Sequence, residues 1–295
     1  MSSVNGNVAF ITGGARGVGE EVARRLHARG AKLVLTDLDE APLKELSADL
    51  GEDRVETVVA DVRDLAAMQA AVGKAVDRFG GIDIVVANAG ISTYGSVLQV
   101  DPGAFKTLMD VNLLGVFHTV RAALPSVIKR RGYVLVVSSL AGYAACPGLA
   151  PYNAAKAAVE HFANALRLEV AHLGVDVGSA HMSWIDTPLV RDGKSDLPTF
   201  QEMLSKLPPP LNRTTSVEEC GAAFVNGIEA RKRQINCPGW VGLFRWLKPV
   251  LSSALGEAPI RRFVPDLLPR MDAEVAALGR SMSARSAAME NRPTS

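Results

Sequence analysis

Tyr152 and Lys156 are the two residues whose types and spacing best fit proton-transfer chemistry. Side chains four residues apart lie on the same face of a helix, so the phenol and the ammonium group would be neighbours. A free phenol has a pKa of about 10 and is a poor base at neutral pH, but a nearby cation stabilises the phenolate and lowers that pKa. The pair predicts a tyrosine that exchanges a proton near pH 7. Because one such pair arises easily by chance, its context must decide.

The glycine-rich segment Thr12–Gly19 is a second candidate site. It follows the apolar run Val8–Thr12 and opens a segment of helical spacing. Gly13, Gly17 and Gly19 allow a tight turn and a close approach to a pyrophosphate, and the free N–H groups of a helix N-terminus favour an anion. A plain strand-to-helix turn needs no such set of glycines. The segment therefore predicts a dinucleotide site.

Asp37, at the end of the second apolar run, bears on which dinucleotide binds. A carboxylate about 20 residues beyond the glycine loop accepts hydrogen bonds from the ribose hydroxyls of NAD and repels the 2′-phosphate of NADP. Arg16 acts in the opposite direction, because a guanidinium pairs with that phosphate. We weigh the acid at the strand end above a flexible arginine and expect NAD, with NADP less favoured. Asp61 is expected to close the adenine pocket, although an N-cap or turn role fits it nearly as well.

Composition excludes several other classes of protein. The 32 Lys and Arg residues against 31 Asp and Glu leave a net charge of +1, which attracts neither nucleic acid nor an anionic membrane. Cys146, Cys220 and Cys237 are odd in number and widely spaced, which argues against a disulfide framework or a zinc site. The five histidines form no ligand-like cluster, so we expect no metal. With no secretory leader pattern and no apolar run of about 18 to 20 residues, a cytoplasmic protein is expected.

Short β-branched runs alternate with longer segments of helical spacing along the chain. The expected strands are Val8–Thr12, Lys32–Thr36, Val55–Val59, Ile82–Ala87, Tyr133–Ser138, Val175–Ser179 and Gln234–Cys237. The expected helices are Gly17–Gly30, Leu65–Phe79, Phe105–Arg131, Asn153–Leu173 and Val217–Arg231. Strands separated by helices pair in parallel, with helices covering both faces. The pattern predicts an α/β fold with a doubly wound, Rossmann-type parallel sheet of about seven strands.

We expect a single catalytic domain over residues 1–239, with further segments around it. Residues 186–214 are rich in proline and polar residues, and a long irregular insertion is usually a mobile lid or a substrate-binding loop. Residues 240–280 predict short helices. This helical extension is either a substrate lid or membrane-contacting surface, or, as we favour, packs onto the body or a neighbouring subunit. Residues 281–295 are small and polar and are expected to be disordered.

The order and spacing of these motifs resemble the short-chain dehydrogenase/reductase family. The resemblance covers about residues 5–237 and adds the turn Asn88–Gly90, Asn112 and Ser139 to the motifs above. It implies an NAD(P)-dependent oxidoreductase, in which Tyr152 is the acid/base for an alcohol or a carbonyl while hydride passes to or from the nicotinamide. The family also implies a homodimer or homotetramer.

The resemblance assigns roles to individual residues. Ser139 would hydrogen-bond the substrate oxygen, Lys156 would lower the phenol pKa and bind the nicotinamide ribose, and Asn112 would kink a helix and hold a water in a relay to Lys156. The implied catalytic residues are therefore Asn112, Ser139, Tyr152 and Lys156. The implied cofactor contacts are Gly13, Arg16, Gly17, Val18, Gly19, Asp37, Asp61, Val62, Asn88, Ala89, Gly90, Tyr152, Lys156, Ile185 and Thr187.

The chain departs from the family pattern at two places. Ala87 stands where relatives commonly have the first of two asparagines, and we expect little effect because Asn88 remains. Met182–Ser183 stands where many relatives have Pro-Gly, although Ile185 and Thr187 should still meet the nicotinamide carboxamide. His181 lies close to this segment, and we expect it to be structural because Tyr152 already fills the proton-transfer position.

The residues available to line a substrate site are mostly apolar and aromatic. They are Tyr94, Tyr143, Cys146, Pro147, Leu149, Trp184, Leu189, Met203, Leu204 and Leu207. Unless they only pack the loop, they predict an uncharged secondary alcohol or ketone, such as a terpenoid, steroid or lipid-derived compound. We therefore expect an NAD-dependent alcohol dehydrogenase or ketone reductase. The alternatives are an NADPH-dependent carbonyl reductase and a non-catalytic NAD(P)-binding sensor or scaffold.

Overall fold

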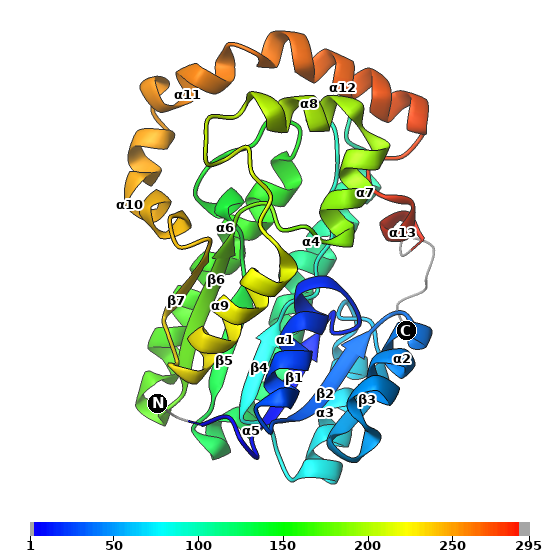
Figure 1. The fold of residues 1–295 in the computed structure, drawn as a ribbon, viewed down its shortest axis with the longest axis vertical. Helices are drawn as coiled ribbons and strands as arrows, with labels where there is room; N and C mark the ends of the chain where they lie inside the picture. The colour runs from blue at the N-terminus through cyan, green and yellow to red at the C-terminus, as the bar shows by residue number, and fades with distance from the viewer. Residues whose placement is uncertain (1–2, 289–295) are drawn as a thin grey trace.

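The computed structural model describes residues 3–288, and in them seven parallel strands form one sheet in the order β3-β2-β1-β4-β5-β6-β7 (Figure 1). The strands are β1 (Val8–Thr12), β2 (Lys32–Asp37), β3 (Val55–Val59), β4 (Ile84–Ala87), β5 (Tyr133–Val137), β6 (Asp176–Met182) and β7 (Gln234–Cys237). The strand order reverses between β1 and β4, where parallel sheets bind ligands beyond the carboxyl ends of their strands. The predicted doubly wound fold is confirmed.

Helices cover both faces of this sheet. One face carries α1 (Gly17–Ala28), α2 (Glu40–Leu50) and α9 (Val217–Glu229), and the other carries α3 (Leu65–Phe79), α5 (Gly115–Arg130) and α6 (Ala150–Val170). Helix α2 is absent from the sequence-based expectations. Its buried residues are only Leu43, Leu46 and Ser47, so its apolar stripe is too narrow to stand out.

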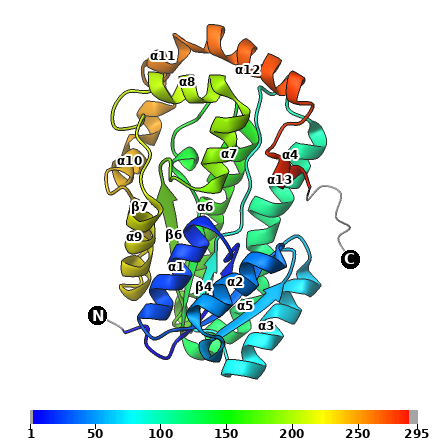
Figure 2. The same ribbon diagram turned by 45° about the vertical axis from the view of Figure 1, so that its right-hand side comes forward.

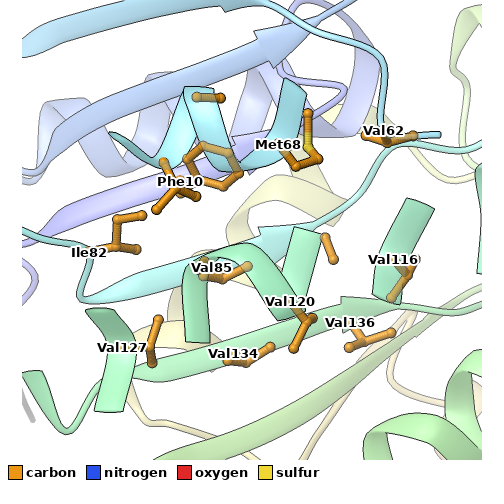
Figure 3. Close-up of a cluster of buried hydrophobic side chains, with 14 of the residues drawn as sticks. Phe10, Val62, Met68, Ile82, Val85, Val116, Val120, Val127, Val134 and Val136 are labelled. Atoms are coloured by element: carbon orange, nitrogen blue, oxygen red, sulfur yellow. The ribbon is translucent and has the colours of Figure 1, made fainter. Parts of the chain in front are cut away.

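The core lies in two layers, one on each face of the sheet. All five residues of β1 and all five of β5 are buried, as central strands covered on both sides require. On the face of α3 and α5, Phe10 of β1 packs with Met68, Val85 and Val120 among the side chains drawn in Figure 3. These layers fix the strand ends that carry the site.

Residues Pro102–Arg130 form one continuous helical stretch, of α4 (Pro102–Met109), a π-helical turn (Asp110–Leu114) and α5. Within the described residues, it is the one helix long and apolar enough to cross a membrane, but half of its apolar window is buried in the protein. It is a core helix, packed against α3 and β4. The π-helical turn contains Asn112, where the family resemblance predicts a kink in the helix.

The segment from residue 186 to 214 differs from the irregular loop expected. It contains α7 (Pro188–Asp196) and α8 (Pro198–Lys206), and each helix has a proline in its first turn, where proline is compatible with a helix. Proline therefore marks helix starts here instead of irregular chain.

The extension is helical, with α10 (Val241–Leu251), α11 (Ala254–Arg261) and α12 (Val264–Leu278), which arch over α7 and α8 (Figures 1 and 2). Helix α12 packs on α8. Disorder is expected for residues 281–295, but residues 281–288 form a buried stretch and a short helix. There α13 (Ala284–Ala287) follows a stretch in which Ser281, Met282 and Ser283 are buried. Residues 289–295 lie outside the described residues.

Candidate active site

A pocket of about 1120 Å³ lies beyond the carboxyl ends of β1, β2 and β4. The predicted contacts that line it are Gly13, Arg16, Gly17, Val18, Asp37, Asp61, Val62, Asn88, Ala89, Gly90 and Thr187. We call it the nucleotide pocket. Four predicted contacts are absent from its lining, namely Gly19, Ile185, Tyr152 and Lys156. Gly19 packs against the carbonyl oxygen of Gly13, and Ile185 is buried in a bridge to Thr215. Tyr152 and Lys156 lie on α6.

The glycine loop leaves no room for a side chain at Gly13 or at Gly19. A Cβ on Gly19 would lie 2.1 Å from the carbonyl oxygen of Gly13, and one on Gly13 would lie 2.9 Å from the Cα of Ala89. The amide of Asn88 donates to the carbonyl oxygens of Thr12 and Gly13, at 3.0 Å each. Asn88 thus ties the loop to the end of β4. Helix α1 begins here with no side-chain cap hydrogen bond, so its first N–H groups have no side-chain acceptor at Arg16.

The acidic residues of the pocket hold fixed positions. Asp37 accepts hydrogen bonds from the backbone N–H of Ala15 at 3.2 Å and of Leu38 at 2.8 Å, which orients its carboxylate at the loop. Arg16 pairs with Asp39 at 2.5 Å, so Asp37 and Arg16 do not neutralise each other. Asp39 is a pocket residue that the sequence reasoning missed.

Asp61 forms a buried ion pair with Arg63. The guanidinium donates to both carboxylate oxygens, at 3.1 Å and 2.7 Å for its closest contact to each. The Arg63 side chain is only 8% exposed. The carbonyl oxygen of the neighbouring Val62 contacts His118 Nδ1 at 3.0 Å. Asp61 is therefore anchored where it lines the pocket, and its turn-forming role includes a hydrogen bond from the N–H of Arg63.

Ser139 and Tyr152 meet at the carboxyl end of β5. Ser139 follows this strand and its hydroxyl also accepts a hydrogen bond from the N–H of Ala141 at 3.1 Å. Tyr152 lies in the first turn of α6, and both Tyr152 and Ser139 line the same cavity. The strand end and the helix start thus bring together two residues that are thirteen positions apart.

Lys156 lies one turn further along α6 and is almost fully buried. Its ammonium nitrogen is 5.5 Å from the centre of the Tyr152 ring and donates to the carbonyl oxygen of Val137 at 3.0 Å. Asn112 is held by two hydrogen bonds with the backbone of Ile91, at 2.8 and 2.9 Å. A Cβ on Gly90 would lie 3.4 Å from Asn112 Oδ1 and 3.6 Å from Lys156 Nζ, so all three residues share one corner.

The pKa shifts at this corner follow burial. Burial raises the pKa of Tyr152, and the neighbouring Ser139 side chain opposes that increase. Burial also lowers the pKa of Lys156 to about 8. The shift of the Tyr152 pKa is set by burial and by Ser139, so the lowering of this pKa by Lys156 stays a prediction.

A second cavity, of about 1040 Å³, opens beside the Tyr152 and Ser139 hydroxyls, and we call it the substrate cavity. None of its lining residues within residues 3–288 carries a charge. Leu189, at the start of α7, lines both this cavity and the nucleotide pocket. The two spaces therefore meet at Leu189.

Most predicted substrate-side residues line this cavity, with two exceptions. Tyr143 stacks on His181 with ring centres 4.4 Å apart, and Leu204 is buried among the side chains of α8 and α12. The sequence reasoning missed Phe200, Ile260 and Phe263 in the wall. Ile260 and Phe263 come from the helical extension, whose contact with the site no local pattern reveals.

Two other reactive side chains, His181 and Cys146, have pKa values that burial moves away from neutrality. His181 is fully buried, contacts Ser179 Oγ at 3.0 Å, and has a pKa lowered to about 4 by burial. Burial raises the pKa of the Cys146 thiol to about 12. Among residues 3–288 no group of three His, Cys, Asp or Glu side chains could hold a metal ion. Ser183 differs, because within the described chain its buried hydroxyl has no partner and it lines the substrate cavity.

A short chain dehydrogenase family model matches residues 7–197, which is more than half of the chain. The chain belongs to this family. Among its relatives, oxidoreductase UcpA of Salmonella typhimurium is 35% identical over 242 residues, covering 78% of this chain and 91% of the relative. An NAD-dependent oxidoreductase of Mycobacterium tuberculosis is 37% identical over 206 residues, covering 64% and 74%.

Solved structures of short-chain dehydrogenases share the fold. One from Burkholderia phymatum, in complex with NAD, has a TM-score of 0.72 at 23% identity and covers 83% of this chain and 94% of its own. A 3-ketoacyl-(acyl-carrier-protein) reductase from Brucella melitensis, complexed with NADH, has a TM-score of 0.71 at 28% identity and covers 79% and 97%. This short-chain dehydrogenase is thus an NAD(P)-binding oxidoreductase that acts on a small molecule.

The nucleotide pocket fits such a cofactor. Gly13 and Gly19 approach so closely that a Cβ on either would collide with backbone atoms, and the compact loop that results lines the pocket at Gly13 and Gly17. The N-terminus of α1 opens into it, and the carboxylate of Asp37 is oriented there. The hydroxyl of Thr36, buried without a partner within residues 3–288, also lines the pocket.

Proposed function

We propose that the protein is an NAD-dependent alcohol dehydrogenase or ketone reductase that interconverts a secondary alcohol and a ketone on an apolar substrate. The observation that carries the proposal is the uncharged cavity lined by both Ser139 and Tyr152, which meets the nucleotide pocket at Leu189. A charged substrate would lose its hydration in this cavity and gain no ionic partner there. An alcohol or ketone loses far less.

Tyr152 transfers the proton in this proposal. Its phenolate takes the proton of the alcohol, or its hydroxyl gives a proton to the carbonyl oxygen, and Ser139 holds that oxygen by a hydrogen bond. The bound cofactor supplies a hydride acceptor or donor and, when oxidised, a positive charge that favours the phenolate. Lys156 adds a second cation at the base of the ring. Asn112, fixed by the backbone of Ile91, keeps the loop after β4 in place beside Lys156.

The fixed acid supports NAD over NADP. Asp37 is held by backbone N–H groups at the pocket, whereas the guanidinium of Arg16 is already paired with Asp39. The carboxylate of Asp37 would repel a 2′-phosphate, and Arg16 would not offset this repulsion because it is paired with Asp39. Titration with NADH and NADPH side by side tests this, and tighter NADPH binding would reverse the preference.

Replacing the proton donor tests the chemistry. Tyr152→Phe should lower kcat by about 10³-fold, because only the hydroxyl is lost, while the dissociation constant of NADH changes little. The measurement is NAD reduction with uncharged secondary alcohols of graded size, with NADH binding followed in parallel. Binding without turnover of any alcohol or ketone by the wild type would favour a sensor or scaffold instead. Faster turnover of small polyols would contradict the apolar substrate.

A further inference from the structure

The chain that follows α12 turns back across the active-site face, and we call residues 280–288 the C-terminal segment. Both ribbon views place α13 beside α7 (Figures 1 and 2). The carbonyl oxygen of Ser281 accepts a hydrogen bond from the N–H of Tyr94 at 2.7 Å, and Met282 forms a bridge with Thr93. Arg280 forms an ion pair with Asp196 of α7 at 2.8 Å. The segment is thus anchored to the loop after β4 and to α7.

This anchoring places three of its residues in the wall of the nucleotide pocket. They are Ser283, Arg285 and Ser286. The hydroxyl of Ser283 accepts a hydrogen bond from the N–H of Ser286 at 3.3 Å, which fixes the short turn that carries Arg285. A segment distant in sequence from the glycine loop therefore contributes to the same pocket.

The charges of the pocket single out Arg285. Its described lining contains four aspartates, Asp37, Asp39, Asp61 and Asp192, and two arginines, Arg16 and Arg285. Arg16 is tightly paired with Asp39 at 2.5 Å. Arg285 is 3.7 Å from Asp192 and its side chain is 44% exposed, a separation and exposure that make a weak ion pair.

Helix α7 links Arg285 to the glycine loop, where a pyrophosphate would bind. Its partner Asp192 lies on α7, which begins at Pro188. A Cβ on Gly17 would lie 3.3 Å from Thr187 Cγ2, so the start of α7 touches the glycine loop. A pyrophosphate on that loop carries two negative charges, and a guanidinium matches phosphate oxygens in charge and geometry.

We propose that Arg285 is a cofactor-binding residue whose guanidinium binds the pyrophosphate of the dinucleotide, so that the C-terminal segment closes the pocket over the bound cofactor. On binding, Arg285 exchanges its weak contact with Asp192 for the phosphate oxygens. This inference rests on the NAD-dependent function proposed above. It adds a contact from outside the region that carries the family motifs.

Binding measurements on the full chain test it. Arg285→Ala should weaken NADH and ADP-ribose by about tenfold each, because both ligands carry the pyrophosphate and only one carries nicotinamide. Arg285→Lys keeps the charge without the paired donors and should give an intermediate loss. The matched control is Arg262→Ala, which removes an exposed arginine at the end of α11 and should change both affinities by less than about twofold.

Hydrogen exchange gives a second readout that does not depend on activity. NADH should protect the backbone of residues 280–288 from exchange in the wild type. This protection should be lost in Arg285→Ala. If Arg285→Ala bound both ligands with wild-type affinity, this inference would be overturned and the proposed function would not. A loss confined to NADPH would also overturn it, because the contact would then be to the 2′-phosphate. A wild type that binds no dinucleotide would overturn the proposed function as well.

Discussion

The nucleotide pocket and the substrate cavity differ in what forms their walls. Close backbone packing and charged side chains shape the first, where Gly13 and Gly19 are in contact and Asn88 ties the loop to β4. Apolar side chains dominate the second, and they come from segments as distant as Leu140 and Phe263. A backbone-built site tolerates few substitutions at its glycines, whereas a side-chain-built cavity can change its specificity residue by residue. The comparison predicts that mutations in the two regions have separable effects.

Gly19→Ala should have the largest effect and should be confined to the nucleotide pocket. The added Cβ would lie 2.1 Å from the Gly13 carbonyl oxygen and 2.7 Å from Asn88 Nδ2, so the loop must move. We expect NADH affinity to fall by about 100-fold or more, with a lower melting temperature. Gly73→Ala is the control, since a Cβ there meets nothing within 4 Å and alanine stabilises a helix. Equal NADH affinity in Gly19→Ala and the wild type would contradict the tight crossing.

Lys156→Met tests the burial of the ammonium group on α6 through stability. The folded-state pKa of Lys156 is lowered to about 8 from an unfolded value of 10.5, so the unfolded state binds more protons between these values. The free energy of unfolding should therefore rise with pH across this window, by up to about 3 kcal/mol from this group. The methionine variant should lack that rise.

Urea denaturation at pH 7.5 and pH 10 measures the difference. Exposed Lys129→Met should keep the wild-type pH dependence, because its ammonium stays hydrated in both states. If Lys156→Met and the wild type gained the same stability over this range, the burial of a charged Lys156 would be contradicted.

Phe263→Ala should have the smallest of these effects and should be confined to the substrate cavity. Phe263 lines the wall from the helical extension, so its loss should raise the KM of an apolar ketone by about tenfold through lost apolar contact. The dissociation constant of NADH should be unchanged. Phe105→Ala, at a half-exposed side chain outside the cavity, is the matched control. Weaker NADH binding in Phe263→Ala would show that the two regions are coupled.

The same contrast explains what sequence reasoning could predict. The strands, the glycine loop and most nucleotide-pocket residues follow from contiguous motifs, because local backbone geometry forms that site. The ion pair of Arg16 with Asp39 was not predictable, since the choice between two nearby aspartates depends on the turn after β2. The proline-rich, polar composition of residues 186–214 predicts an irregular loop, although Pro188 and Pro198 begin helices.

The substrate cavity depends on long-range packing. Tyr143 and Leu204 have the residue types of a cavity wall, but other elements cover them. Ile260, Phe263 and Arg285 reach the two spaces only because the helices after β7 fold back over α7 and α8. No periodicity in the chain encodes that return. The single catalytic domain over residues 1–239 stays a prediction, and so does the homodimer or homotetramer.

The π-helical turn at Asp110–Leu114 has a consequence for how this protein can vary in length. Successive residues of an α-helix are rotated by about 100°, and the turn holds one residue more than a regular helical turn would. Deleting one residue there would restore a regular helical turn, so the stripe of Val116, Val120 and Val127 on Gly115–Arg130 would keep its face on the sheet. The helix can therefore lose one residue at this point without exposing the core.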